Sequence, residues 1–446
     1  MTRHKLSRHN ILSKIDGSED YFIINLLSRN ADILNGPEAR MILSENFSDV
    51  TLKQKLIDNN YFVDPEQESK TYKEHYLDFL DNRDSDEIQI FFASTYTCNF
   101  DCSYCYQSEY TNQTKELTRE LIDAFFNYIN TTFAGKQKYI TLFGGEPLVD
   151  NSNYKKHLQY FFQKVKESQL SIAIVTNGYN ISKYISEFKD LGIREIQITL
   201  DGPPAIHNKR RPLKNGQGTF KEISNGVDLL LENEIPVNLR VVVDKENLTS
   251  LVDLADYATE KGWNDSPIFK TQLGRNYELH TCKKSNPALY DRINLYQDLH
   301  KLIITHPNIL KFHRPAYSIS KFLFDNGALP DPLFDSCPGT KTEWAFDYTG
   351  RIYSCTATVG KEGESLGTFY PEISLNNQQI AEWQERDVTS IPECANCNLQ
   401  LACGGGCASV AKNKTGKILS PDCRPVKELL ELGIDLYFKK DLTKEK

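Results

Sequence analysis

The sequence predicts an α/β protein whose central unit is a partial, TIM-like (β/α)6 barrel, with a small module before it and a cysteine-rich domain after it. Strand-like and helix-like segments alternate from Glu87 to about residue 280, the pattern of parallel strands joined by helices. Cysteines are absent from the first 97 residues and then fall mainly in spaced groups. We therefore divide the chain into an N-terminal module (1–85), the barrel (86–280), a helical connector (281–330) and a cysteine-rich domain with a C-terminal helix (331–446).

Composition places the chain among ordinary globular proteins. At 446 residues it is long enough for about two to four domains. Its net charge of -8 offers no basic stripe for nucleic acid. No apolar run approaches the roughly 18 residues of a membrane span, and no apolar segment of a secretory signal follows the basic N-terminus. We expect a cytoplasmic protein that binds neither nucleic acid nor membrane.

The barrel is predicted from six strands and the helices between them. The first strand, Ile88–Ser94, is a nearly continuous apolar run, as expected for a parallel strand that is covered on both faces. Active sites of such barrels lie at the C-terminal ends of the strands. The other expected strands are 139–145, 171–178, 195–202, 237–244 and 267–274, and the expected helices are 117–133, 154–167, 181–191, 220–231 and 248–261.

Three cysteines follow the first barrel strand, in the segment Thr97–Gln107. Cys98, Cys102 and Cys105 have the spacing C-x3-C-x2-C. Cubane iron–sulfur clusters and tetrahedral zinc both take four ligands, so three thiolates leave one metal position open to another molecule. An open position predicts chemistry, and these three cysteines are the predicted catalytic residues. A zinc knuckle is the alternative that this loop alone leaves open.

The same loop, with Tyr104 before the third cysteine and Tyr106 after it, resembles the cluster loop of the radical S-adenosylmethionine (SAM) enzymes. In that family the open iron is chelated by the amino and carboxylate groups of SAM. The resemblance implies one [4Fe–4S] cluster on Cys98, Cys102 and Cys105, with SAM as its partner. It extends over roughly residues 87–430.

Glycine and polar motifs follow the next strands. FGGEP, Phe143–Pro147, has paired glycines that allow close backbone approach, and Glu146 offers a carboxylate to an ammonium group; it resembles the SAM amino-group motif of the family. The resemblance places His207, Arg210 and Arg211 near the mouth of the pocket. The favoured alternative is that these side chains are solvated or cap a helix. The residues that the resemblance places at SAM or the substrate are Tyr104, Gly144, Gly145, Glu146, Pro147, Asn177, Asp201 and Arg240.

Seven further cysteines lie in the C-terminal part of the chain. They follow the pattern C-x12-G-x4-C, then C-x2-C-x5-C-x3-C, then a last cysteine. This resembles the SPASM domain, the auxiliary-cluster extension of many radical SAM enzymes. A two-zinc ribbon is the weaker alternative, because seven ligands do not divide into two fours. The metal ligands expected here are Cys337, Cys355, Cys394, Cys397, Cys403, Cys407 and Cys423.

The resemblance divides these seven cysteines into two auxiliary sets. Cys337, Cys355 and Cys407 would hold the first auxiliary cluster, and Cys394, Cys397, Cys403 and Cys423 the second. Together with the barrel this gives three [4Fe–4S] clusters. The fourth ligand of the first auxiliary cluster stays open: it could be Cys282, another side chain, water or a thiolate of the substrate.

The N-terminal module is predicted to be winged-helix-like. A strand at Tyr21–Leu27, a segment Ala31–Gly36 that ends in an Asn-Gly turn signal, and helices at Glu38–Leu43, Thr51–Asp58 and Gln67–Leu80 follow one another. This order resembles the leader-peptide recognition domain of peptide-modifying radical SAM enzymes. An extension without a special role is the alternative.

The resemblances imply an oxidoreductase that cleaves SAM reductively and takes hydrogen from its substrate. The first expectation is a maturase that installs a thioether or carbon–carbon cross-link in a ribosomally made precursor peptide, with an electron donor such as flavodoxin or ferredoxin. The alternative is an anaerobic sulfatase-maturing enzyme, which forms formylglycine. Those enzymes carry an Asp where this chain has Thr356. A pure electron-transfer or regulatory iron–sulfur protein is disfavoured by FGGEP, since it needs no SAM site.

Overall fold

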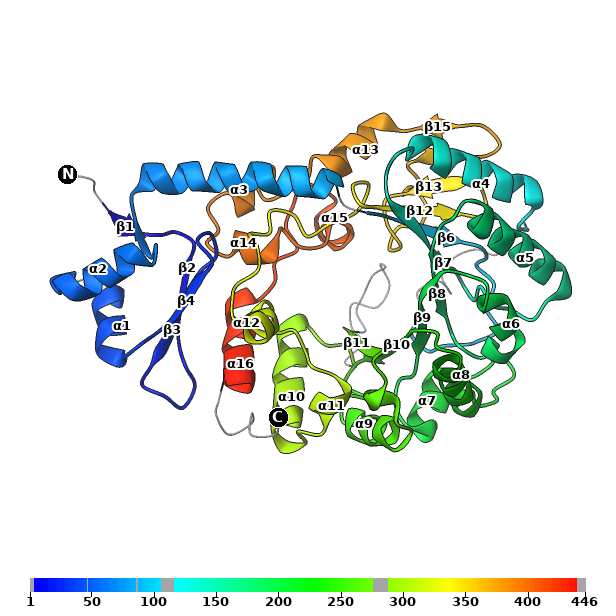
Figure 1. Ribbon diagram of the computed structural model, residues 1–446, viewed down its shortest axis with the longest axis horizontal. Coiled ribbons are helices and arrows are strands. Elements are labelled where there is room, and N and C mark those ends of the chain that lie inside the picture. Colours follow the sequence, from blue (N-terminus) through cyan, green and yellow to red (C-terminus); the bar gives the residue numbers. More distant parts are fainter. Residues whose placement is uncertain (1–3, 46, 86, 106–115, 276–287, 439–446) are drawn as a thin grey trace.

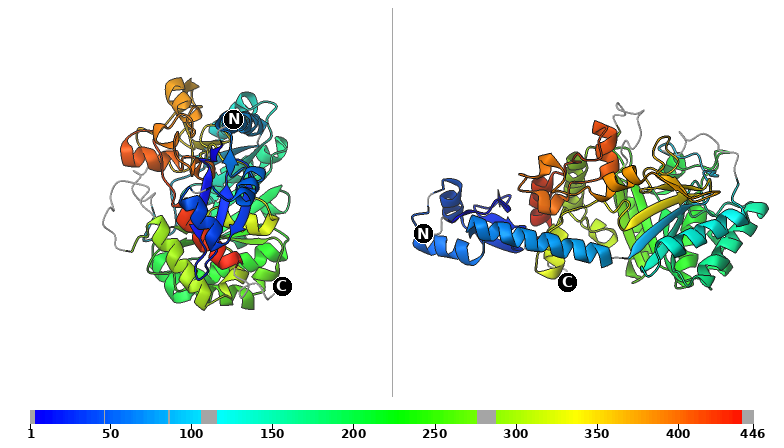
Figure 2. Two further views of the ribbon diagram at one scale, coloured as in Figure 1. Left: turned by 90° about the vertical axis from the view of Figure 1, so that its left-hand side faces the viewer. Right: turned by 90° about the horizontal axis from the view of Figure 1, so that it is seen from above.

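A computed structural model describes residues 4–438 except 46, 86, 106–115 and 276–287. The barrel sheet and its helices form one end of the molecule, and the N-terminal strands form the other (Figure 1). The cysteine-rich segments lie between them, along one side. The two ends are joined by a long helix, α3 (Pro65–Ser85), which Figure 2 shows running along the molecule.

The central sheet contains the six predicted barrel strands. They lie in the order β11-β10-β9-β8-β7-β6, and every neighbouring pair is parallel. The α/β partial barrel is therefore confirmed. The strands are β6 (Ile88–Ala93), β7 (Lys138–Phe143), β8 (Ile172–Thr176), β9 (Ile193–Thr199), β10 (Val237–Val243) and β11 (Phe269–Arg275).

Amphipathic helices cover the outer face of this sheet. Phe92 of β6 packs against Phe125 of α4 and Phe161 of α5, with ring centroids 4.5 and 5.1 Å apart. The helices are α4 (Arg119–Thr132), α5 (Ser152–Glu167), α6 (Ile185–Phe188), α7 (Pro204–Arg210), α8 (Phe220–Glu232) and α9 (Leu251–Glu260). The single helix expected over 181–191 is instead a 3-10 turn, Ile181–Lys183, followed by α6, because Tyr184 leaves helical geometry with φ -124°.

The sheet does not end at the barrel. β12 (Glu343–Asp347), from the cysteine-rich region, pairs in parallel with β6, and Phe346 lies opposite Phe92. The strands β13 (Arg351–Tyr353), β14 (Gly367–Thr368) and β15 (Ser374–Leu375) continue the sheet in antiparallel fashion. Cys337 precedes β12 and Cys355 follows β13, so both lie near strands that are joined to β6, the strand that leads into the Cys98 loop.

The N-terminal module has a three-stranded antiparallel sheet, β2-β3-β4, and a separate β1-β5 pair. Asn35-Gly36, expected as a turn, begins α1: the Asn35 side chain accepts from Glu38 N–H while Glu38 accepts from Asn35 N–H. The elements are β1 (Lys5–Leu6), β2 (Asn10–Lys14), β3 (Tyr21–Asn25), β4 (Asn30–Leu34), α1 (Gly36–Leu43), α2 (Val50–Asp58) and β5 (Phe62–Val63).

Helix α3 joins this module to the cysteine-rich region through aromatic contacts. Tyr72, Tyr76 and Phe79 surround Phe334, with ring centroids 5.1, 5.2 and 5.6 Å away. Ile11 and Phe22 of the module share a buried cluster with Cys394, Cys403 and neighbouring apolar residues of that region. The module is therefore packed onto the cysteine-rich region rather than held by a linker.

Short helices complete the connector and the C-terminal region. None of the helices in the described part of the chain is long and apolar enough to cross a membrane. They are α10 (Arg292–Thr305), α11 (Ile309–Phe312), α12 (Ser320–Asn326), α13 (Asn377–Gln384), α14 (Gln400–Cys403), α15 (Ala408–Thr415) and α16 (Val426–Phe438).

His9 makes the packing of the N-terminal module sensitive to pH. It is fully buried, stacks on Tyr72 at 5.6 Å, and accepts a hydrogen bond on Nε2 from Arg8 at 3.1 Å. Burial, and then the Arg8 charge, lower the pKa of His9 from 6.5 to about 4. The folded chain therefore binds this proton less readily than the unfolded chain, so stability is complete above pH 6.5 and falls as the pH drops towards 4.

We predict that lowering the pH from 7 to 5.5 destabilises this packing in the parent by roughly 1 kcal/mol more than in His9→Gln, which has no titrating imidazole. Hydrogen exchange of the α3 amides at the two pH values measures the difference. The same pH dependence in parent and variant would contradict the prediction.

Candidate cluster and cofactor site

The Cys98 loop is held by a second segment of the barrel, 210–214. Asp101 N–H donates to Pro212 O at 2.9 Å, Ser103 N–H to Arg210 O at 3.0 Å, and Lys214 N–H to Asn99 O at 3.0 Å. These bonds run on both sides of an antiparallel bridge between Phe100 and Leu213. The loop that carries Cys98 and Cys102 is thus supported as if it were a short strand.

The FGGEP turn packs directly against the other side of this loop. Gly145 N–H donates to Thr95 O at 2.8 Å and Glu146 N–H to Thr97 O at 2.9 Å. A Cβ on Gly144, which has φ +148°, would lie 2.3 Å from Thr95 O, and one on Gly145 would lie 2.4 Å from Thr97 O. Only glycines permit this approach, which brings Glu146 to the start of the cysteine loop.

The Glu146 carboxylate is buried and already bonded. It accepts from Leu148 N–H at 2.8 Å, from Thr176 Oγ1 at 2.5 Å and from Asn177 N–H at 2.6 Å. Burial raises the pKa of Glu146, and these donors oppose the rise because they favour the ionised form. A fixed carboxylate of this kind suits the ammonium group that the sequence assigned to it. Pro147, which follows, is buried.

Asn177 lies beside the first cysteine. Its Nδ2 donates to Asn99 Oδ1 at 2.8 Å, and Cys98 Sγ is 3.9 Å away. Arg240, on β10, faces Gly274 of the neighbouring strand, where an added Cβ would lie 2.8 Å from an Arg240 amino nitrogen. Gly274 therefore leaves room for the Arg240 guanidinium. The described structure brings Asn177 to the cysteine loop and places Arg240 on the fifth barrel strand, where the sequence expected it.

Tyr104 is the centre of a buried polar network. Its hydroxyl donates to Asp201 Oδ2 at 2.6 Å and accepts from Arg211 at 2.7 Å. Arg210 donates to Asp201 at 3.3 Å and to Asp244 at 2.9 Å. Burial, partly opposed by Arg211, raises the pKa of Tyr104 well above its usual value, so the phenol stays protonated. Asp201 thus contacts both Tyr104 of the cysteine loop and Arg210 of the segment that supports the loop.

Arg211 brings a positive charge to the loop cysteines. Burial raises the pKa of Cys102 to about 11, and Arg211 is the nearby charge that opposes this rise; burial also raises the pKa of Cys98 to about 12. The guanidinium lies 5.7 Å from the Phe100 ring, and its buried Nε has no hydrogen-bond partner among the described residues. The sequence favoured a solvated or capping role for Arg211, and only the pairing of 210–214 with the loop shows otherwise.

The C-terminal cysteines gather as two groups. The pKa of Cys355 is raised by burial and also by the neighbouring charges of Glu343, Cys337 and Cys407. That of Cys394 is raised to about 11 by burial and then by Cys403, Cys397 and Cys423. Cysteines assigned to the same auxiliary set are thus near enough to influence one another's pKa. Cys282 lies outside the described residues.

Thiols that neighbour one another and are partly or wholly buried suit iron–sulfur ligation chemically, because bound iron replaces their protons. In the described part of the chain no three His, Cys, Asp or Glu side chains are close enough to hold one metal ion. The ligand assignments of all ten spaced cysteines therefore stay predictions.

Two residues of the cysteine-rich region carried no signal in the sequence. Arg386 is fully buried and donates to the carbonyls of Ile418, Gly406, Gly405 and Ser420 at 2.7–3.1 Å. Glu343 accepts from Thr356 N–H at 3.3 Å, and burial raises its pKa to about 7. Both roles depend on contacts between distant segments, which no local pattern reveals.

Comparison with known proteins shows what this chain is similar to. Residues 92–258 match the Radical SAM superfamily. The chain is 29% identical over 380 residues to the serine-type anaerobic sulfatase-maturating enzyme of Bacteroides thetaiotaomicron, with 76% of this chain and 86% of that protein covered. A GTP 3',8-cyclase of Campylobacter fetus is 28% identical but is matched over only 51% of its own length.

Two solved structures have the same fold. AnSMEcpe with bound AdoMet and the Cp18Cys peptide superposes with a TM-score of 0.58 at 18% identity, covering 78% of this chain and 96% of that one. Streptococcus suis SuiB bound to its precursor peptide SuiA superposes with a TM-score of 0.51 at 13% identity, covering 94% of this chain and 99% of that one.

Residues 92–258 thus form a domain of the Radical SAM superfamily, which implies a [4Fe–4S] cluster and SAM. The cysteine-rich C-terminal region fits the SPASM type that the sequence predicted.

We predict that Arg211→Met loosens the cysteine loop. The change removes the bond to Tyr104 and the charge beside Cys102 while keeping an apolar stem of similar length. Since a charged hydrogen bond contributes about 1.5–3 kcal/mol, formation of 5'-deoxyadenosine should fall roughly ten-fold or more, with fewer irons retained. Iron analysis and chromatography of the nucleoside measure both. Arg194→Met, which breaks a surface ion pair with Glu87, is the control and should change neither. Parent-like iron content and cleavage in Arg211→Met would refute the role.

Proposed function

We propose that this enzyme is a peptide maturase, which abstracts hydrogen from a ribosomally made precursor peptide and installs a thioether or carbon–carbon cross-link. The observation that carries the proposal is the N-terminal module, packed against the cysteine-rich region through Phe334. A structure bound to a precursor peptide, that of SuiB, is matched over 94% of this chain, whereas the sulfatase-maturating structure is matched over 78%. The N-terminal module is the segment expected to grip a leader.

When bound, the SAM cluster and SAM supply a 5'-deoxyadenosyl radical able to take hydrogen from an unactivated carbon. The chain's own part is to bind and position. Glu146, fixed by three donors, would hold the SAM ammonium group, and Asn177 after β8 and Arg240 within β10 would contact its other polar groups. Tyr104 and Arg211 would keep Cys98, Cys102 and Cys105 in place.

We assign auxiliary [4Fe–4S] clusters to the two C-terminal cysteine sets, which makes three clusters in all. They would accept the electron released when the product bond forms, or bind the substrate. A small electron donor such as flavodoxin or ferredoxin would reduce the SAM cluster. We place the enzyme in the cytoplasm, with a peptide and an electron donor as its partners and neither nucleic acid nor membrane among them.

The leader is proposed to add as an extended strand to the edge of β4, a known mode of peptide recognition. The opposite edge strand, β2, faces α16, where Ser13 bonds to Glu431. On β4, Ile33 is 56% exposed, which is unusual for a large apolar side chain on a short strand. An apolar leader residue would cover it.

The assignment of the SAM cluster predicts that changing Cys98, Cys102 and Cys105 together to Ala removes about four of roughly twelve irons, since each cubane holds four. Formation of 5'-deoxyadenosine should stop, because no reduced cluster faces SAM. Iron analysis and chromatography measure the two losses. A triple variant that still made 5'-deoxyadenosine at the parent rate would show that the catalytic assignment is wrong.

For the leader, we predict that Ile33→Glu weakens precursor binding about ten-fold, since it places a charge where apolar contact is expected. Cleavage of SAM without peptide should be unchanged. Glu45→Gln, elsewhere on the same module, is the control. Removing residues 1–80 is a poorer test, because Ile11 and Phe22 belong to the buried cluster that includes Cys394. Equal precursor binding by Ile33→Glu and the parent would remove the β4 site.

Oxidation of a Cys or Ser to formylglycine is the second candidate, favoured by the 29% identity to a sulfatase-maturating enzyme. The Asp that sulfatase-maturing relatives carry after the first-set cysteine is Thr356 here. Glu343 lies nearby and accepts from Thr356 N–H, and burial raises its pKa to about 7. It is therefore the carboxyl group that could replace the absent Asp as a base. Formylglycine reacts with hydrazides, whereas a cross-linked peptide does not.

A further inference from the structure

A cavity of about 360 Å³ lies outside the barrel interior, at the end of β11. Its walls are the outer face of β11, the connector helix α10, the segment 313–316 and the start of α15. Lys270 and Gln272 of β11 interact with Glu195 and Gln197 of β9, and the alternate residues Thr271, Leu273 and Arg275 line this cavity, as does Gln272. It is therefore separate from the predicted SAM site.

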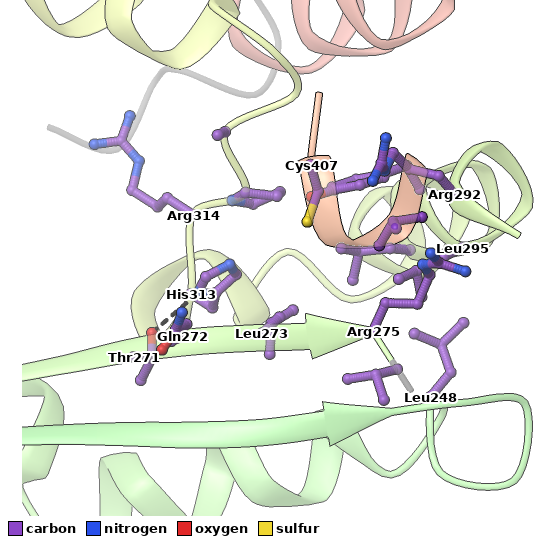
Figure 3. A pocket seen from close by; sticks show the side chains of 16 residues that line it. Leu248, Thr271, Gln272, Leu273, Arg275, Arg292, Leu295, His313, Arg314 and Cys407 are labelled. Atoms are coloured by element: carbon purple, nitrogen blue, oxygen red, sulfur yellow. Dashed lines mark hydrogen bonds between the residues drawn. The ribbon is translucent and has the colours of Figure 1, made fainter. Parts of the chain in front are cut away.

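Positive side chains meet at one side of the cavity. Figure 3 shows the guanidinium groups of Arg275 and Arg292 lying close together from different elements, with Cys407 next to Arg292 and the Arg314 guanidinium pointing away. Arg275 donates to Tyr290 O at 2.5 Å. None of the described residues that line the cavity is an Asp or Glu.

The carboxylate of Asp422 lies beside Arg292, 3.3 Å from its guanidinium, but it is also 2.9 Å from Lys414. Tyr296, which lines the cavity, feels the charges of Arg292, Arg424 and Arg275 together. Its hydroxyl has no hydrogen-bond partner among the described residues. The buried Asp422 is thus shared between Arg292 and Lys414.

Apolar side chains line much of the cavity, beside the polar Thr271, Gln272 and His313. Leu248, Leu273, Leu295 and Leu299 contribute the floor, together with Pro315. An occupant that suits both parts has an apolar body and a negative end. Arginine pairs with carboxylates in a two-pronged geometry that gives orientation as well as affinity.

We propose that this cavity binds a carboxylate of the substrate peptide, carried next to an apolar side chain. The carboxylate is either that of an Asp or Glu residue or the peptide's C-terminus, and Arg275, Arg292 and Tyr296 receive it. Because Cys407 belongs to the first auxiliary set, the bound segment lies beside that set. The inference rests on the proposed function and adds an acidic position to the substrate.

A simpler role for the arginines is to balance the charge of iron–sulfur clusters on the neighbouring thiolates. The two roles differ in what an arginine substitution removes. An arginine that only balances cluster charge is needed to retain iron, whereas one that receives the peptide is needed to bind a carboxylate.

The experiment titrates the full-length, anaerobically reconstituted enzyme with short peptides by calorimetry, without turnover. Acetyl-Leu-Glu-Leu-amide should bind, and acetyl-Leu-Gln-Leu-amide should not. Acetyl-Leu-Gln-Leu with a free C-terminus distinguishes a terminal carboxylate from a side-chain one. Arg292→Gln should weaken the acidic peptide about ten-fold or more at unchanged iron content, because one charged hydrogen bond is lost. Arg275→Gln is the second variant and should do the same.

Lys301→Gln is the matched control, since Lys301 is on the same helix, is 75% exposed and pairs with Asp298 away from the cavity. It should bind the acidic peptide as the parent does. Equal affinity for the Glu and Gln amides, loss of iron in step with loss of binding, or competition by phosphate or SAM as strong as by the acidic peptide would each overturn the proposal. Cross-linking by an enzyme that fails to bind the acidic peptides would refute this inference alone. Binding by an enzyme that makes no cross-link would refute the maturase function alone.

Discussion

The guanidinium group of Arg386 donates hydrogen bonds to four backbone carbonyls, and the cysteine-rich region is arranged around it. Gly405 and Gly406 lie between Cys403 and Cys407, while Ile418 and Ser420 precede Cys423. One side chain thus links the loops of both auxiliary sets. A buried carbonyl left unpaired costs about 1–3 kcal/mol, so no apolar residue could replace it. The region has few long helices or strands. The hydrogen bonds of Arg386 therefore hold its loops together, as the hydrogen bonds of the sheet hold the barrel together.

The barrel site depends on a comparable arrangement, in which the cysteine loop has no regular structure of its own. The segment 210–214 supports it on one side and the FGGEP turn on the other. Tyr104 of the loop is in turn joined to Asp201 and Arg211, and Arg210 pairs with Asp201. Buried ion pairs add little net stability, but they define one geometry, because any displacement leaves a charge unpaired. A loop that holds a metal cluster at a fixed distance from SAM needs one fixed geometry, and these ion pairs provide it even where they add little stability.

The features that the sequence predicts are those with local signals. The apolar run Ile88–Ala93 and the alternation after it predict the barrel, and the cysteine spacing predicts which thiols gather. Asn35-Gly36 was misassigned as a turn, because Asn suits a helix N-cap equally well. The pairing of β12 with β6, the support of the loop by Arg211 and the role of Arg386 were not predicted. Each joins segments that are far apart in the chain, where a single residue has no periodicity to reveal it.

The parallel pairing of β6 with β12 also constrains how the chain can fold. Residues 88–93 emerge from the ribosome long before residues 343–347, so the first barrel strand waits with one edge unpaired while about 250 residues are made. Contacts of such high sequence separation form slowly, and an open apolar edge is a site of aggregation. An excised barrel would carry this edge permanently. We therefore expect the catalytic barrel to be soluble only together with the cysteine-rich region, because that region supplies β12, the strand that covers the open edge of β6.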